Sequence, residues 1–174
     1  MGAFIRGFIG RKEIIDELLS KEWLNRKVQY LSQGFALLFL TDEFYDDILE
    51  LADECEKSEF PWNNISTFLN SSILNILENK STNQNTIGYL ELDFFGGVGE
   101  QIATLYENGK MVIEPIKTEL QWNYEGNLTV KKSVPEGIND GAINFVLKHM
   151  GVQRDRNKDE FNSLGLEKIR YMPE

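Results

Sequence analysis

The stretch that most constrains the fold runs from residue 86 to residue 109, TIGYLELDFFGGVGEQIATLYENG. Its first half alternates between an apolar set and a mixed set of side chains, a period of two that predicts a β-strand. Glycines at positions 96, 97 and 99 then allow positive φ or close backbone approach. A second β-prone run, 102–106, ends at Asn108-Gly109, a strong turn signal, and a third run follows at 111–116. These segments predict the centre of an antiparallel sheet.

The rest of the chain adds strands and helices to this centre. Alternating or wholly apolar runs predict strands over 3–9, 27–31 and 34–40, and a further hairpin over 119–124 and 127–132. Apolar residues at helical spacing predict helices over 11–23, 41–56, 66–79 and 138–150. With 174 residues and 41% hydrophobic content, the chain is long enough to bury a core. We therefore expect one α+β domain, residues 1–174, with a mostly antiparallel sheet packed with three or four helices.

Charge and composition exclude several function classes. The net charge of −10 makes a nucleic acid an unfavourable ligand, because its phosphates would be repelled. A basic partner is the natural counterpart, although acidity can also serve solubility alone. One cysteine, Cys55, and one histidine, His149, exclude an internal disulfide and a Cys/His zinc set, so we expect no metal and no cofactor. No run approaches the length of a membrane span, and the cysteine usage suits the cytoplasm.

The predicted helix 41–56 carries the most one-sided charge of the chain. Thr41 is positioned as its N-cap, and acids in its first turn interact well with the helix dipole. Acidic residues without interleaved lysines repel one another and lack partners at i,i+4. A basic protein would relieve this repulsion, whereas the alternative is a solvated helix side. The candidate partner-binding residues here are Asp42, Glu43, Asp46, Asp47, Glu50, Asp53 and Glu54.

Glu91 and Asp93 form the second candidate site. They lie two apart on one face of the predicted strand, so their carboxylates are expected about 6–7 Å apart. That spacing suits a divalent cation or an acid/base pair. It is equally ordinary on the solvated face of a sheet, where the two groups would face a partner protein. We count both among the partner-binding residues and expect no catalytic role for either.

The remaining chemistry-bearing residues have structural explanations. The Gly96-Gly97-Val98-Gly99 connection lacks the Lys-Ser/Thr ending of a P-loop and precedes a strand, so it is expected to be a tight sheet connection. Gln101 is expected to hydrogen-bond across that turn. His149 falls near the end of a helix, where its charge would interact with the dipole.

Three segments together resemble a family of immunity proteins from bacterial toxin–immunity systems. The first, YLELDFFGGVGEQ, fits a pattern Y-I-E-x-D-Y-F-G-G-x-G-x-Q at Tyr89, Glu91, Asp93, 95–97, Gly99 and Gln101. The second is the helix 144–152, where Asn139 and Ala142 are offset from the family's pattern. The third is Asp159-Glu160-Phe161 followed by Gly165-Leu166. The resemblance covers roughly the C-terminal half of the chain.

This resemblance implies a small cytoplasmic antidote that binds and neutralises the C-terminal toxin domain of a contact-delivered effector. Such toxins are often basic nucleases, to which an acidic surface is complementary. Two alternatives stay open: a small metal-dependent or acid/base hydrolase that uses Glu91 and Asp93, and a general interaction domain. The sequence leaves the oligomeric state, the toxin's activity and the binding face undetermined.

Overall fold

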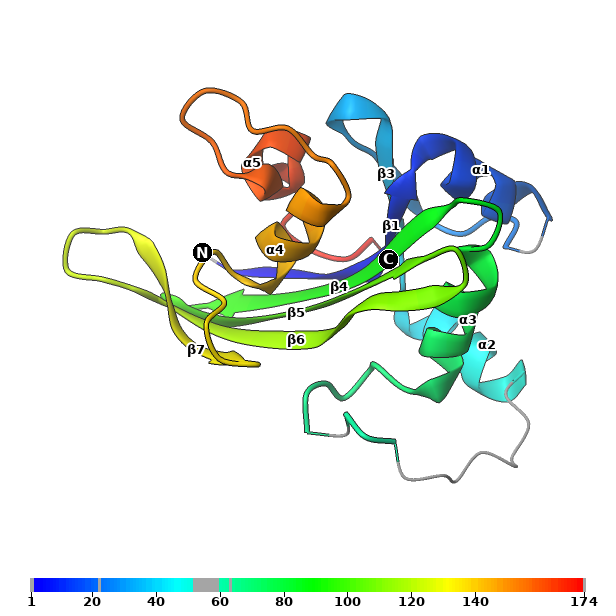
Figure 1. Ribbon diagram of the computed structural model, residues 1–174, viewed down its shortest axis with the longest axis horizontal. Helices are drawn as coiled ribbons and strands as arrows, with labels where there is room; N and C mark the ends of the chain where they lie inside the picture. The colour runs from blue at the N-terminus through cyan, green and yellow to red at the C-terminus, as the bar shows by residue number, and fades with distance from the viewer. Residues whose placement is uncertain (1, 22, 52–59, 63, 174) are drawn as a thin grey trace.

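The computed structural model describes residues 2–21, 23–51, 60–62 and 64–173. Within them the chain forms one seven-stranded antiparallel sheet with helices on both faces (Figure 1). The strands are β1 (Ala3–Arg11), β2 (Val28–Tyr30), β3 (Phe35–Phe39), β4 (Thr86–Phe95), β5 (Val98–Glu107), β6 (Lys110–Trp122) and β7 (Leu128–Val134). The α-helices are α1 (Lys12–Lys21), α2 (Asp42–Leu51), α3 (Ser71–Lys80), α4 (Ala142–His149) and α5 (Glu160–Leu164), and the 3₁₀ turns are η1 (Ser32–Gly34) and η2 (Leu166–Lys168).

The strand order is β2-β3-β1-β4-β5-β6-β7, and every pairing is antiparallel. The predicted α+β class is confirmed. One prediction about the strands is wrong: 111–116 and 119–122 are not separate elements but parts of the single long strand β6. The polar pair Lys117-Thr118 interrupts the apolar pattern between the two predicted runs, but both residues pair with β5 and continue the strand.

Each face of the sheet carries its own core. One core lies between the sheet and the pair α4 and α5, and includes Leu90, Leu92, Ile143 and Leu164. The other lies between the sheet and α1, α2 and α3, and its largest buried rings include Phe8, Phe44 and Tyr89. Alternation along each strand sends neighbouring residues to opposite cores. We call these two surfaces the α4 side and the α2 side of the sheet.

The predicted β4–β5 hairpin forms, but β5 begins at Val98, four residues before the predicted run 102–106, so Gly96-Gly97 alone make the turn. Gly96 and Gly97 take φ of 64° and 92° in the turn, and Asn108-Gly109 takes 53° and 72° in the β5–β6 turn. Both are left-handed conformations that favour Gly and Asn. At Gly99 a Cβ atom would stand 2.4 Å from a ring carbon of Phe94, so this glycine is required for close approach. The glycine-rich connection is therefore a structural turn.

The helices on the α2 side begin at capping residues. Thr41 Oγ1 accepts a hydrogen bond from Phe44 N at 3.3 Å, as expected of an N-cap for α2. The described part of α2 ends at Leu51, and the rest of the predicted helix lies outside the described residues. α3 begins later than predicted, at Ser71 rather than residue 66. Asn70 caps it by accepting from Ile73 N, and the apolar residues before it belong to the preceding loop.

The start of α4 is held by side chains from the sheet. Gln101 Oε1 accepts from Ile143 N at 3.2 Å, and Thr118 Oγ1 accepts from Ala142 N at 3.0 Å. These bonds satisfy two of the free N–H groups at a helix N-terminus. The expected bond from Gln101 across the glycine turn is wrong, because strand alternation aims this side chain at the α4 side. Gly141, with φ of 83°, leaves no room for a Cβ against the Gln101 amide.

The C-terminal segment folds back onto α4. Asn144 Oδ1 accepts from Phe161 N at 2.8 Å, and Asp159 caps α5 by accepting from Asn162 N at 2.8 Å. α5 ends at Gly165, whose φ is 86°. The three segments that carry the resemblance therefore meet on the α4 side, and several of their polar residues have structural roles there.

β7 is one edge of the sheet and contains a bulge. Lys132 pairs with Glu119 and Val130 pairs with Leu120, which leaves Lys131 without an opposite residue on β6. Lys131 and Lys132 are both exposed. Bulges and lysines at an edge discourage pairing with a further strand. None of the helices formed by the described residues has the length and apolar character needed to cross a bilayer.

The α4 anchor yields a stability prediction. Gln101→Ala leaves the buried N–H of Ile143 without an acceptor, a loss of about 1–3 kcal/mol in the free energy of unfolding. Urea denaturation of the wild type and the variant measures it. Gln121→Ala, on the same pair of strands but on the other face, is the matched control and should cost little. Equal losses in both variants would contradict the anchoring role.

Candidate functional site

Part of the α2 side of the sheet extends beyond the helices. α2 and α3 lie beneath one end of the sheet, whereas the end that holds the β4–β5 turn and much of β7 reaches past them (Figure 1). On that end no described helix covers the side chains, and the strand register decides which of them lie next to one another.

Three carboxylates form a row across this surface, one on each of three neighbouring strands. Asp93 of β4 is paired with Glu100 of β5, and Glu100 is paired with Glu119 of β6. Directly opposed residues on one face have Cβ atoms about 4.5–5.5 Å apart, and like charges at that spacing are destabilising. We call Asp93, Glu100 and Glu119 the carboxylate row.

Two lysines partly neutralise the carboxylate row. Lys117 Nζ lies 2.8 Å from Glu100 Oε1, and Lys132 Nζ lies 3.8 Å from Glu119 Oε1. Both pairs are partly exposed, so each is expected to contribute little to stability. Asp93 is exposed and has no lysine of its own among the described residues. The row therefore keeps an excess of negative charge at the surface.

An apolar pair flanks the carboxylate row on the side of the β4–β5 turn. Phe95 and Val98 are opposite one another in the hairpin register and lie on the same face as the row. Their side chains are 76% and 61% exposed. Apolar residues beside charged ones are typical of protein-binding surfaces, where the ring supplies an anchor and the charges supply orientation.

Glu91 lies one row further toward the helices and differs from Asp93. Its Oε1 accepts a hydrogen bond from the buried Tyr89 hydroxyl at 2.6 Å and another from Ser66 Oγ. Burial raises the pKa of Glu91; the two hydrogen bonds and the positive charges of Arg6 and Lys117 oppose this rise without cancelling it. The two carboxylates share a face as predicted, but only Asp93 is on open surface.

Glu91 and two members of the carboxylate row line one small cavity. It measures about 230 Å³ and is lined by Asp93, Glu100 and Glu91 on the sheet side and by residues 64–68 on the other. Lys117 also reaches its wall. Its polar, acidic lining suits a cationic group such as the end of a lysine or arginine side chain.

The acidic face of α2 is only partly free. Asp42 forms an ion pair with Arg6, and Asp47 forms one with Arg26, so two of the predicted acids have cationic partners from distant parts of the chain. The expectation that these acids lack partners is wrong for this pair, because the partners come from tertiary contacts rather than from i±4 positions. Glu43, Asp46 and Glu50 are exposed. Asp53 and Glu54 lie outside the described residues.

Arg6 explains why α2 begins where it does. The Arg6 side chain is 1% exposed, and its Nε donates to Leu40 O at 2.6 Å while Nη2 donates to Asp42. Its guanidinium lies over the Phe68 ring, 3.7 Å from the ring centre. A buried cation without such partners would be costly. Asp42 therefore serves the fold by pairing with Arg6, although its own side chain is 92% exposed.

The other candidate groups have local partners or fall outside the description. His149 is exposed, its Nδ1 lies 2.8 Å from Phe145 O, and its ring packs against Phe145, in line with a local role. Among the described residues no cluster of three or more His, Cys, Asp or Glu side chains has the arrangement to hold a metal ion. Cys55 lies outside the described residues.

Sequence reasoning missed two members of the carboxylate row. Glu100 was detectable, because a two-residue turn at 96–97 places residues 93 and 100 at equal distances from it. Glu119 was not, because the β5–β6 pairing contains register shifts that sequence spacing does not reveal. The register of the three strands is what places these acids next to one another.

Glu91 gives a prediction for pH titration. Its folded pKa is raised above the ordinary value of 4.5, so the folded protein holds this proton more tightly than the unfolded chain. Its contribution to stability is therefore greatest at low pH and decreases as pH rises from 4.5 through the folded pKa. Carboxyl-detected NMR should show a Glu91 midpoint above 4.5. Ser66→Ala, which removes a hydrogen bond to the ionised form, should raise the midpoint further; a lowered midpoint would contradict this account.

Comparison of this chain with protein-family models, with curated proteins and with solved structures found no match in any of the three. No family is thereby shown. The resemblance to immunity proteins stays a prediction, and the geometry of the α2 side is the observation that bears most directly on function.

Proposed function

We propose that this protein is an immunity protein that binds a cognate toxin domain and neutralises it through the acidic α2 side of the sheet. The observation that carries the proposal is the carboxylate row, in which Asp93, Glu100 and Glu119 are held side by side on a part of the sheet that no described helix covers. Like-charge repulsion within the row destabilises this surface, and binding of an oppositely charged partner relieves that repulsion.

The distribution of charge along the chain supports the same side. Residues 42–59 contain nine acidic residues and one lysine, which makes −8 of the total net charge of −10. The described acids of this stretch lie on α2, and Glu43, Asp46 and Glu50 point to solvent. Concentrated charge of one sign steers an oppositely charged partner and raises its association rate. A basic nuclease cleft is the class of surface that fits best.

The apolar pair beside the row supplies what charge alone does not. Exposed charges orient a partner, but most binding energy at protein interfaces comes from a few desolvated anchors. Phe95 and Val98 provide such an anchor at the rim of the acidic surface. Inhibition by this mechanism needs a rigid surface and direct binding, and it requires no bond-making step in this protein.

The test uses the C-terminal toxin domain encoded beside this protein. Surface plasmon resonance should show tight binding that weakens about tenfold or more between low and physiological salt, because surface charges are screened. Neutralising the row, with Asp93→Asn, Glu100→Gln and Glu119→Gln together, should slow association about tenfold or more. The toxin's activity should return in proportion.

The control removes the same charge elsewhere. Glu107→Gln, Glu125→Gln and Asp155→Asn change three exposed acids outside the row and leave its register intact. This variant should bind the toxin domain with nearly the wild-type rate. Equal effects of the two triple variants would show that net charge, not the α2 side, governs binding. Failure to bind any neighbouring toxin domain would end the proposal.

A second candidate function is an acid/base or metal-dependent hydrolase. The raised pKa of Glu91 beside a cavity shared with Asp93 is the observation that favours it. Replacing Glu91 with Gln and Asp93 with Asn would then abolish turnover or metal uptake while the variant stays folded. Titration calorimetry of the wild type with Mg²⁺, Ca²⁺ and Mn²⁺ separates the two functions, since the immunity role predicts no heat of binding.

A further inference from the structure

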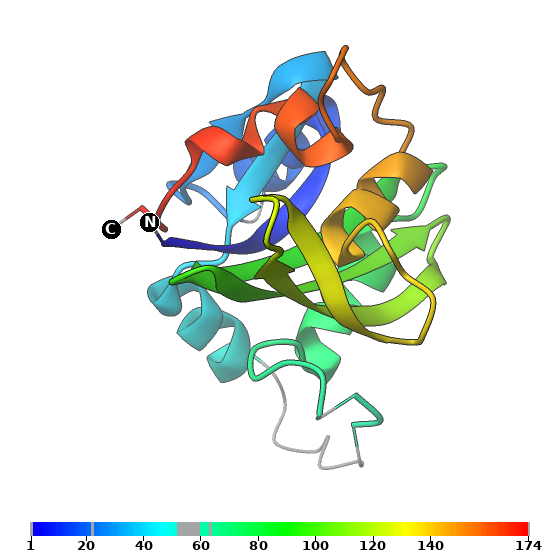
Figure 2. The ribbon, with the colours of Figure 1, turned by 90° about the vertical axis from the view of Figure 1, so that its left-hand side faces the viewer.

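A hollow lies on the opposite side of the sheet. It measures about 570 Å³, within the range of small-molecule sites. The β6–β7 hairpin bends up toward the side that carries α4 and α5 and forms one wall (Figures 1 and 2). The floor is the sheet itself, with the apolar side chains of Leu92, Phe94, Leu120 and Val130.

The outer wall of the hollow is aromatic. Trp122 lines it, is 51% exposed and makes an edge-to-face contact with Phe94, with ring centres 6.3 Å apart. Leu128 is opposite Trp122 in the β6–β7 register and lines the same wall. The π face of an indole attracts cations, so a half-exposed tryptophan in this wall favours a cationic ligand.

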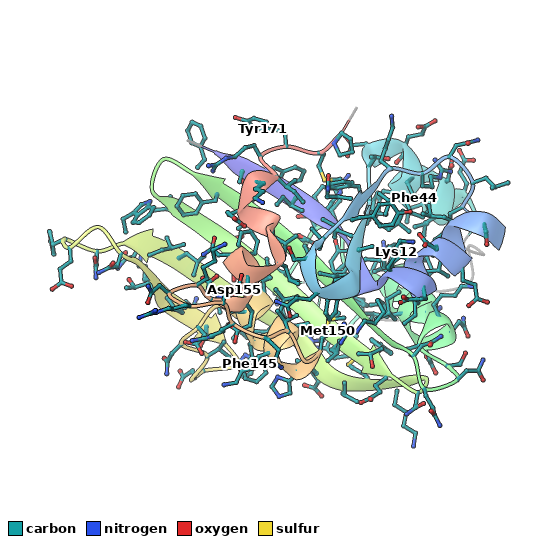
Figure 3. The ribbon with its side chains drawn as sticks, turned by 90° about the horizontal axis from the view of Figure 1, so that it is seen from above. Lys12, Phe44, Phe145, Met150, Asp155 and Tyr171 are labelled. Atoms are coloured by element: carbon teal, nitrogen blue, oxygen red, sulfur yellow. The ribbon has the colours of Figure 1, made fainter. Side chains whose placement is uncertain are left out.

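The inner wall is polar and carries more acid than free base. Asp140, Asp159 and Glu167 line it, together with Arg154 and Arg170. Arg154 is already engaged: its Nε donates to Glu160 Oε1 at 2.8 Å and its Nη2 lies 3.7 Å from Asp140 Oδ2. Figure 3 shows the molecule from above, with Asp155 and the C-terminal helices on this side of the sheet. With three carboxylates against two guanidinium groups, the wall has a small excess of negative charge.

Glu167 is the group in this wall that lacks a partner. Its Oε2 is buried, and no described residue donates a hydrogen bond to it. A buried carboxylate oxygen without a donor carries the full cost of its desolvation. Glu167 is itself part of the hollow's lining, so a cationic donor entering the hollow can neutralise the carboxylate that the fold leaves uncompensated.

We propose that this hollow is a binding site for an organic cation, a guanidinium or ammonium group carried on a flat apolar body. The charged end lies at Glu167, and the apolar body lies on the sheet floor against Trp122 and Leu128. Neutral ligands of the same shape can donate a hydrogen bond to Glu167 but leave its charge unneutralised, and anions are repelled by it. The site is on the opposite face from the carboxylate row and does not depend on the proposed function.

The experiment compares three compounds on the full chain. Phenylguanidine carries the cation on a flat ring, phenylurea is its neutral counterpart, and benzoate is an anion of similar size. Titration followed by ¹⁵N NMR should show saturable shifts of the Trp122 indole N–H with phenylguanidine. Phenylurea should bind about tenfold or more weakly, since it lacks the charge that pairs with Glu167.

Two variants localise the site. Glu167→Gln should weaken phenylguanidine about tenfold, and Trp122→Leu should weaken it less, about threefold. Glu119→Gln, on the other face, is the control and should leave binding unchanged. Equal affinity for phenylguanidine and phenylurea in the wild type would overturn the proposal even if Glu167→Gln fails to fold. Absence of any shift at Trp122 would overturn it as well.

Discussion

The pairing of β4 with β1 on one side and β5 on the other is the constraint on which the remaining structure depends. A two-glycine turn at Gly96-Gly97 fixes the β4–β5 register, and the period of two then assigns every β4 side chain to a face. A slip by one residue would move Leu90 and Leu92 out of the α4 core and onto the α2 side. It would also turn Asp93 inward. The same register that builds the core therefore arranges the surface charges.

Most of the central sheet could be predicted from sequence, because its signals are local. Alternation marks β4, Asn108-Gly109 marks the β5–β6 turn, and Gly151 follows the last turn of α4 as a C-terminal glycine should. Long-range effects could not be predicted. β6 continues through Pro115, and Gln101 turns to Ile143, because tertiary pairing and strand direction decide both.

The candidate site was likewise predictable only where its signals are local in the sequence. The acidity of α2 and the shared face of Glu91 and Asp93 follow from spacing alone. The burial of Glu91 beneath Ser66, and the ion pair between Asp42 and Arg6, require segments that are 25 and 36 residues apart to meet. Sequence spacing identifies which acids exist, whereas tertiary contacts decide which of them remain at the surface. For this reason the carboxylate row on the sheet, more than the helix α2, is the main candidate for the binding site.

The bulge in β7 has a consequence for how this protein meets others. With Lys131 displaced from the ladder and Lys132 beside it, the outer strand is a poor template for backbone pairing. Under the proposed function, the partner is therefore bound by side chains on a broad face of the sheet and not by a strand added at β7. Point substitutions on such a face change the binding surface without disturbing the sheet beneath.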